Sequence, residues 1–173
     1  MKEPRSQGKR TMETKSAEND LLANLADMGL TLPKRSPSPI GAFCNVREHR
    51  GILYVSGQGP IHADGTAMTG KVGDEVSAET AREHAKLVAL NILSVVRDHL
   101  GDLGRVESVL KILGLVNAVP HFERHPFVID GASELFYGVF GSSGMHARSS
   151  FGVGSLPNSI TVEIEAILTL FDV

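Results

Sequence analysis

One segment, residues 105–119, constrains the fold of this chain more than any other. It has the length and alternation of a β-strand, and apolar residues occur at both of its alternating sets of positions. One set comprises Leu110, Ile112, Gly114 and Val116, and the other comprises Val109, Lys111, Leu113 and Leu115. Helices can cover only one face of a sheet, so the second apolar face predicts a further layer or a further subunit.

Two stretches of helical periodicity flank this strand in the sequence. In the first, Ser77 can cap the helix and Gly101 ends it. Its apolar residues recur at spacings of three and four, and they are Ala81, Ala85, Val88, Ala89, Ile92, Leu93, Val96 and Leu100. A second helix is expected at residues 128–140, and a short amphipathic one at residues 19–28. Each helix therefore has one face for a core and one for water.

Shorter strand patterns complete the expected sheet. Residues 42–47 and 52–56 are expected as two strands around the turn 49–51, and residues 161–171 as the last strand. The elements then follow in the order β-β-α-β-α-β-β. This order predicts an α+β domain, in which two helices pack on one face of a mixed sheet and self-association buries the other face.

Charge and composition limit the classes of protein. The net charge is −3 and the pI is near 6.1, so the chain lacks the basic footprint of a DNA-binding protein. The single cysteine, Cys44, excludes an internal disulfide and a multi-cysteine metal site. No apolar run is long enough to cross a bilayer. We therefore expect a cytoplasmic protein with no membrane partner, in which a disordered extension at residues 1–18 precedes one domain at residues 19–173.

A fixed cation and a carboxylate lie on two neighbouring runs of strand character, residues 146–151 and 156–165. A short Gly/Pro/Asn turn joins these runs, so a hairpin is expected to place Arg148 beside Glu163. The planar guanidinium of Arg148 suits a carboxylate or phosphate ligand. The structural alternative is an ordinary ion pair between Arg148 and either Glu163 or Glu165.

A glycine-containing turn and the histidines are the remaining candidates. In Ser56-Gly57-Gln58-Gly59-Pro60, two glycines would let backbone amides approach a ligand, although a simple turn after a strand has the same pattern. None of the seven histidines has the spacing of a metal-ligand motif, so neither a metal nor a cofactor is expected. His146 borders the proposed cleft and is kept as a candidate.

Four short motifs follow one another between residue 32 and the C-terminus. They are Tyr54-Val-Ser-Gly-Gln-Gly-Pro60, His146-Ala-Arg-Ser149, Leu156-Pro157 and Val162-Glu-Ile-Glu165. Together they resemble the YjgF/Rid family of reactive-intermediate deaminases, also labelled endoribonuclease L-PSP. Four further segments resemble a longer subgroup without an assigned substrate, namely Gly29-Leu-Thr-Leu-Pro33, Gly70-Lys-Val-Gly73, Gly101-Asp-Leu103 and Asp130-Gly-Ala-Ser133. The resemblance implies a chorismate-mutase-like fold and a homotrimer with a central β-barrel and three clefts between subunits.

The resemblance also implies roles for individual residues. Arg148 matches the family arginine that grips a ligand carboxylate, and Glu163 matches the glutamate that positions or activates water. Ser56, Gly57 and Ser150 match positions in the wall of the cleft, with the backbone amides of Gly57 and Ser150 as expected hydrogen-bond donors.

Three positions depart from the family pattern. Phe43 stands in place of a tyrosine, Asp130 in place of an asparagine and Ser150 in place of a cysteine. Phe43 lacks a hydroxyl donor, and Asp130 adds a negative charge that disfavours an acidic substrate. These changes bear on the choice of substrate rather than on the fold.

The leading functional hypothesis is therefore the reaction that the resemblance implies, hydrolysis of small 2-imino acids to 2-keto acids and ammonia. The alternative is a non-catalytic trimer that binds small carboxylate metabolites in the same clefts. An endoribonuclease is disfavoured, because the chain is acidic and has no Trp and only two Tyr to stack on bases.

Overall fold

The computed structural model describes residues 17–171, and within them a five-stranded sheet has the strand order β1-β2-β5-β3-β4. Strand β5 lies between β2 and β3 and is antiparallel to both, whereas β4 is parallel to β3. The strands are β1 (Val46–His49), β2 (Ile52–Gln58), β3 (Val106–Asn117), β4 (Ala147–Val153) and β5 (Val162–Leu170). The predicted mixed sheet and the predicted order of elements are confirmed.

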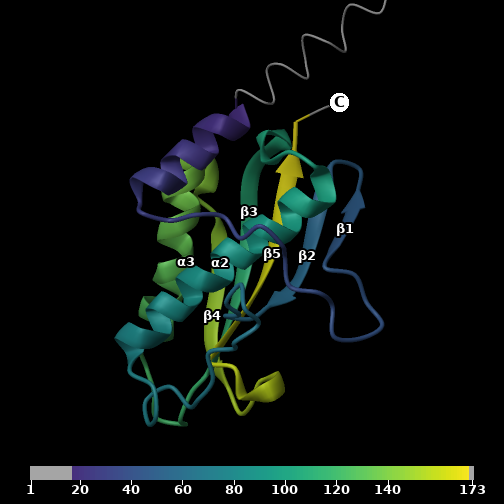
Figure 1. Ribbon diagram of the computed structural model, residues 1–173. Helices are drawn as coiled ribbons and strands as arrows, with labels where there is room; N and C mark the ends of the chain where they lie inside the picture. The colour runs from purple at the N-terminus through teal and green to yellow at the C-terminus, as the bar shows by residue number, and fades with distance from the viewer. Residues whose placement is uncertain (1–16, 172–173) are drawn as a thin grey trace, which may run out of the picture.

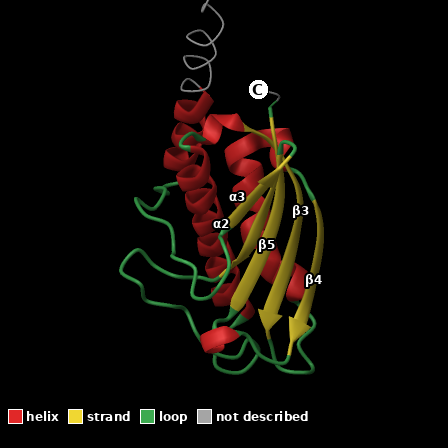
Figure 2. Cartoon of the chain, turned by 90° about the vertical axis from the view of Figure 1, so that its right-hand side faces the viewer, coloured by secondary structure: helices red, strands yellow, loops and turns green. Residues whose placement is uncertain are grey.

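The helices form a layer on one face of the sheet (Figure 2). Helix α2 (Ala78–Leu100) packs beside α3 (His125–Phe140), and both lie across the strands (Figure 1). A helical segment at residues 17–27 joins the same layer. Residues 17 and 18, the first described ones, are already helical, so the predicted disordered extension is wrong at these two positions. Residues 1–16 of the predicted extension lie outside the described residues, and their disorder stays a prediction.

Both long helices have ends that the sequence explains. The Ser77 hydroxyl accepts a hydrogen bond from the Thr80 amide at 3.0 Å, and Gly101 ends α2 in the left-handed conformation at a φ of 76°. Helix α3 begins at His125, three residues before the predicted start. Its second residue is Pro126, which is well tolerated in a first turn because that position needs no amide donor.

The extended segment that leads into β1 crosses the helix layer to the far edge of the sheet (Figure 1). It is held there by α2, because the Pro33 carbonyl accepts hydrogen bonds from Arg97 at 2.7 Å and from Ser94 at 3.2 Å. Strand β1 begins at Val46 rather than at the predicted residue 42. The residues before it form bends that carry Phe43 and Cys44.

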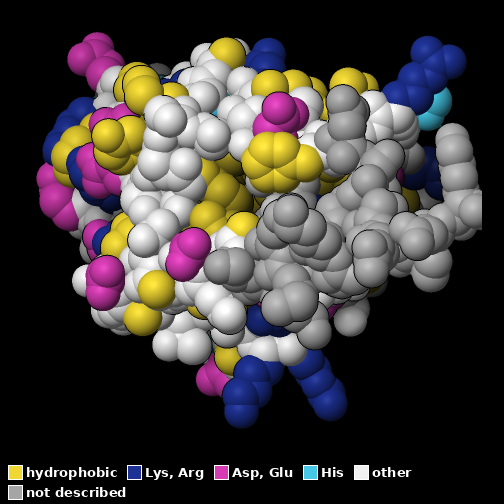
Figure 3. Space-filling view, turned by 90° about the horizontal axis from the view of Figure 1, so that it is seen from above, with side chains coloured by type: hydrophobic (Ala, Val, Ile, Leu, Met, Phe, Trp, Pro, Cys, Tyr) yellow, Lys and Arg dark blue, Asp and Glu magenta, His cyan; other side chains and the backbone are white. Residues whose placement is uncertain are grey.

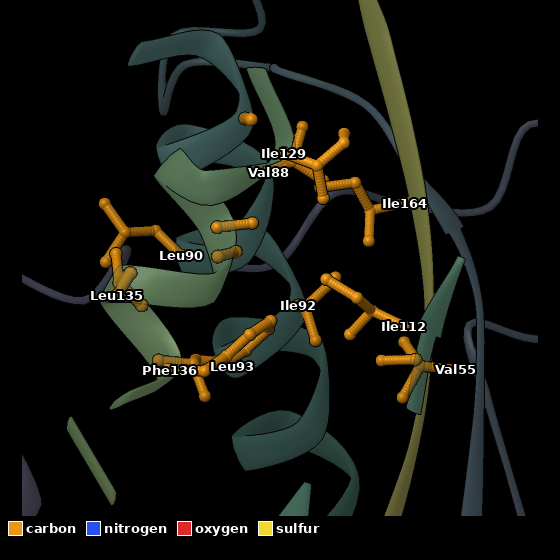
Figure 4. Close-up of a cluster of buried hydrophobic side chains, with 14 of the residues drawn as sticks. Val55, Val88, Leu90, Ile92, Leu93, Ile112, Ile129, Leu135, Phe136 and Ile164 are labelled. Carbon is orange, nitrogen blue, oxygen red and sulfur yellow. The ribbon is translucent and has the colours of Figure 1, made fainter. Parts of the chain in front are cut away.

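The core lies between the helix layer and the sheet (Figure 4). Ile92 and Phe136 come from the helices and Ile112 and Ile164 from the sheet, and all four are fully buried. At Gly114 the sheet approaches α3 closely, since a Cβ there would lie 2.5 Å from the Ile129 Cδ1 atom. A side chain at this position would therefore push α3 away from the sheet.

The opposite face of the sheet has no covering layer among the described residues (Figure 2). Its exposed side chains include Tyr54 and Phe151, each 47% exposed, and Leu110 at 43%. The predicted alternation in β3 is wrong near Leu110, because a register shift between Val109 and Lys111 turns Val109 toward the core. The predicted second apolar face is nevertheless present.

Among the described residues, no helix combines the length and the apolarity that a membrane crossing demands. The expected cytoplasmic location stays a prediction.

Candidate functional site

The expected hairpin between the strands of Arg148 and Glu163 is wrong. Strand β3 lies between β4 and β5 in the sheet, and β4 runs parallel to β3. The connection from β4 to β5 therefore passes across the end of β3 instead of turning back beside β4. The Lys71 ammonium group stabilises this connection, since it donates to the Gly154 carbonyl at 2.6 Å and to the Asn117 side chain of β3 at 2.7 Å.

Arg148 and Glu163 lie on opposite faces of the sheet. Arg148 is in register with Ile112, which is fully buried under the helices, and its side chain reaches α3. Glu163 is in register with Leu115, which is also paired with the exposed Phe151 of β4 on the open face. The alternative of an ion pair between Arg148 and Glu163 or Glu165 is therefore wrong within one chain.

Arg148 belongs to a cluster of polar groups between β4 and α3. Its Nη1 atom lies 2.6 Å from Asp130 Oδ1 and donates to Ser133 Oγ at 3.0 Å. Ser133 Oγ is also 3.1 Å from His146 Nε2, and His146 Nδ1 is 2.7 Å from the Gly144 carbonyl oxygen. The cluster fixes the guanidinium from one side through two residues of α3 that are three positions apart.

Hydrogen bonding and burial assign the state of His146. A carbonyl oxygen can only accept, so Nδ1 carries the proton and the unprotonated Nε2 accepts from the Ser133 hydroxyl. Burial lowers the pKa of His146, the hydrogen bond to Gly144 opposes this, and the nearby charge of Arg148 lowers it further. The imidazole is therefore neutral at pH 7, and Arg148 is the cation of the cluster.

A cavity of about 480 Å³ opens beside this cluster. Tyr137 and Met145 provide exposed apolar surface in it, and Glu134 adds a carboxylate that pairs with Arg82. The full lining comprises Ser133, Glu134, Tyr137, Gly144, Met145, His146 and Arg148. We refer to it below as the Arg148 cavity. It is large enough for a small metabolite.

A second cluster, called the Glu163 cluster below, lies where β2 meets β5 and comprises Gly57, Glu163 and Glu165. Gly57 packs so closely on Glu163 that a Cβ at Gly57 would overlap the Glu163 carboxylate. Burial raises the pKa of Glu163, and the charge of Glu165 raises it further. A raised pKa makes a carboxyl group a better proton acceptor than an ordinary glutamate, and the absence of a side chain at Gly57 makes room for it.

The other predicted site residues divide between these two clusters. Ser150 lies on β4, two positions from Arg148 and therefore on the same face. The Ser56 hydroxyl donates to the Cys44 carbonyl at 2.8 Å, which brings the segment containing Phe43 next to β2 and the Glu163 cluster. The structure therefore joins Asp130 with Arg148, and Ser56 and Gly57 with Glu163, but it does not join the two groups within one chain.

Sequence reasoning missed Ser133, Tyr137 and Met145 as lining residues. The spacing of Asp130 and Ser133 on a helix gave a signal for a shared face, but nothing local indicated that this face meets β4. No group of three or more metal-binding side chains occurs within residues 17–171.

Residues 23–166 match the model of the family described as "YjgF/chorismate_mutase-like, putative endoribonuclease". The chain belongs to the YjgF/Rid family. Protein TCP17 of Trypanosoma cruzi is 36% identical over 158 residues, which cover 89% of this chain and 96% of that protein. AldR of Lactococcus lactis, named as a regulator, is 27% identical over 133 residues, which cover 76% of this chain and 90% of that protein.

Solved structures agree with this family and fold. The crystal structure of Atu1372 from Agrobacterium tumefaciens is similar at a TM-score of 0.87 and 36% identity, over 94% of this chain and 99% of that chain. The Rid family protein YyfA from Yersinia pestis is similar at a TM-score of 0.57 and 26% identity, over 79% of this chain and 94% of its own. The chorismate-mutase-like fold that the motifs implied is confirmed.

Proposed function

We propose that this protein hydrolyses small 2-imino acids to 2-keto acids and ammonia, in clefts between the subunits of a homotrimer. The observation that carries the proposal is the division of the predicted site between the two faces of one sheet. Arg148 with Asp130 lies on one face, and Glu163 with Gly57 lies on the other. A complete site then requires Arg148 of one copy beside Glu163 of a second.

The open face of the sheet supports the assembly. It carries exposed Tyr54, Leu110 and Phe151, and association of three copies around this face would remove these side chains from water. Burial of each large apolar side chain contributes about 1.5–3 kcal/mol. The same association would bring β4 of one copy toward the Glu163 cluster of its neighbour.

Each residue has a chemical task in this reaction. The guanidinium of Arg148 holds the substrate carboxylate and fixes the position of the C=N carbon. Water adds to that carbon, the nitrogen takes a proton, and the C–N bond of the resulting amino alcohol breaks to release ammonia and the keto acid. Glu163 passes protons between the water and the leaving nitrogen, for which its raised pKa is suited. The backbone amides of Gly57 and Ser150 are the proposed further donors.

The first test is imine hydrolysis itself. An amino-acid oxidase generates 2-imino acids from several amino acids, and semicarbazide traps the imine that remains. We expect the protein to reduce trapping, and Arg148→Ala to abolish that effect because the carboxylate loses its partner. The Arg148→Ala variant should keep the size of the wild type in analytical ultracentrifugation, and monomers or aggregates would show that Arg148 is structural instead.

A carboxylate-binding module without catalysis is the second candidate, because the clustered Arg148 supports binding whether or not reaction follows. Glu163→Gln separates the two functions, since it should lower turnover at least about a hundredfold while carboxylate binding stays within about threefold. Unchanged turnover in Glu163→Gln would contradict the role of Glu163. In the described part of the face shown in Figure 3, both acidic and basic side chains occur.

A further inference from the structure

We propose that the Arg148 cavity selects ligands that combine one carboxylate with a cationic side chain, and that Asp130 sets this preference. The inference rests on the proposed function only for the reacting C=N group. The preference itself concerns binding, so it also holds for ligands that do not react.

The hydrogen bonds of Arg148 leave room for one carboxylate. Its contacts with the described residues, to Asp130 and to Ser133, both use Nη1. The opposite edge of the guanidinium, formed by Nε and Nη2, has the parallel donors that bind a carboxylate in bidentate fashion. The arginine side chain is 26% exposed and lines the cavity, and we place the ligand carboxylate on this edge.

The charges around the cavity determine which ligand fits. The cation of Arg148 is already offset by Asp130, and Glu134 is offset by Arg82. His146 contributes no positive charge, because it is neutral at pH 7. A bound carboxylate therefore leaves one excess negative charge, which a cation on the same ligand neutralises and a second carboxylate doubles.

The shape of the cavity indicates where that cation lies. Tyr137 is 56% exposed and Met145 is 71% exposed, and both line the cavity beside Arg148. An aliphatic chain can pack on Met145, and a terminal ammonium or guanidinium can lie over the Tyr137 ring or near the exposed Glu134 carboxylate. The fitting class of ligand is thus a carboxylate with a long basic chain and no charged amine beside the carboxylate, such as a 2-imino acid whose imine nitrogen is neutral.

The test measures binding of 5-guanidinopentanoate, hexanoate and glutarate to the full-length protein by isothermal titration calorimetry. These are arginine, norleucine and glutamate without the α-amino group, so each has a carboxylate at one end and they differ in the charge at the other end of the chain. We expect 5-guanidinopentanoate to bind at least about tenfold more tightly than glutarate, with hexanoate between them. Asp130→Asn should bring the three affinities within about threefold of one another, because the amide keeps the shape of the carboxylate and removes its charge.

A matched control is Asp74→Asn, which removes one charge from an exposed loop away from the cavity and should leave the order unchanged. Glutarate binding as tightly as 5-guanidinopentanoate, an unchanged ratio in Asp130→Asn, or no binding of all three would each overturn the inference. Parallel imine assays separate it from the proposed function. If the ligands bind in the expected order but no imine is hydrolysed, the proposed hydrolysis is wrong and the inference stands. If imines are hydrolysed but the ligands do not bind in this order, the inference is wrong and the proposed hydrolysis stands.

Discussion

Glu163 illustrates at the scale of one residue how a functional group can lower stability. Its folded-state pKa is raised from 4.5 by burial and by Glu165, so the folded protein favours the protonated form. The ionised form therefore lowers stability above the folded-state pKa, and this penalty disappears as the pH falls below 4.5. In the Arg148→Ala variant, which lacks the cation that the proposed trimer places beside Glu163, we expect the additional Glu163→Gln change to raise the Tm at pH 7 and to leave it unchanged at pH 4. The gain should be below about 1 kcal/mol, because water still solvates the half-buried side chain.

Thermal denaturation followed by circular dichroism at the two pH values measures this difference. The control is Glu107→Gln in the same Arg148→Ala background, at an exposed position of β3, which should leave the Tm unchanged at both. A lower Tm for Glu163→Gln at pH 7 would mean that the ionised carboxylate stabilises the fold, contrary to its environment in this chain.

At the scale of elements, Gly114 sets the distance between the sheet and α3. A methyl group there would lie 2.5 Å from Ile129 Cδ1 and 2.6 Å from Ile129 Cγ1, and Ile129 is a fully buried, branched side chain with little freedom to move. We expect Gly114→Ala to lower the free energy of unfolding by about 1–3 kcal/mol, as measured by urea denaturation. Gly154→Ala is the matched control, because nothing lies within 4 Å of its Cβ position. Equal stability of the two variants would show that α3 shifts freely.

The elements themselves could largely be predicted from the sequence. Helix α2 is bounded by Ser77 and Gly101, whose effects are local, and the prediction of both ends is confirmed. The order of the strands could not be predicted, because the pairing of β4 with β3 depends on contacts between distant residues. The bulge between Val109 and Lys111 could not be predicted either. Apolar residues occur at both alternating sets of positions in this strand, so the pattern fits the strand with or without one extra residue.

The same distinction applies to the candidate site. Its residue types were read from the motifs, whereas the pairing of Asp130 with Arg148 depends on where α3 packs on β4. The separation of Arg148 from Glu163 by the thickness of the sheet also depends on β3 lying between their strands. The prediction that Arg148 and Glu163 contact each other within one chain is therefore wrong, and their roles in a site stay a prediction.

At the scale of the whole molecule, a site shared between copies predicts complementation. Arg148→Ala and Glu163→Gln should each be inactive alone. An equal mixture of the two that is unfolded and refolded together should recover about a quarter of the wild-type activity. In random trimers each shared site has an even chance of an intact Arg148 and an even chance of an intact Glu163. The assay is imine hydrolysis by the mixture. Simple mixing of folded proteins without refolding is the control, and absence of recovery after refolding would contradict a shared site.

The position of β4 at the edge of the sheet has a consequence for hydrogen exchange. Among the described residues β4 pairs only with β3, so half of its amides have no strand partner and the strand can open without disturbing the rest of the sheet. Arg148 links this edge to α3 through Asp130 and Ser133. A ligand on the free edge of the guanidinium would add a further attachment, and the exchange rates of the β4 amides would then report occupancy of the site directly.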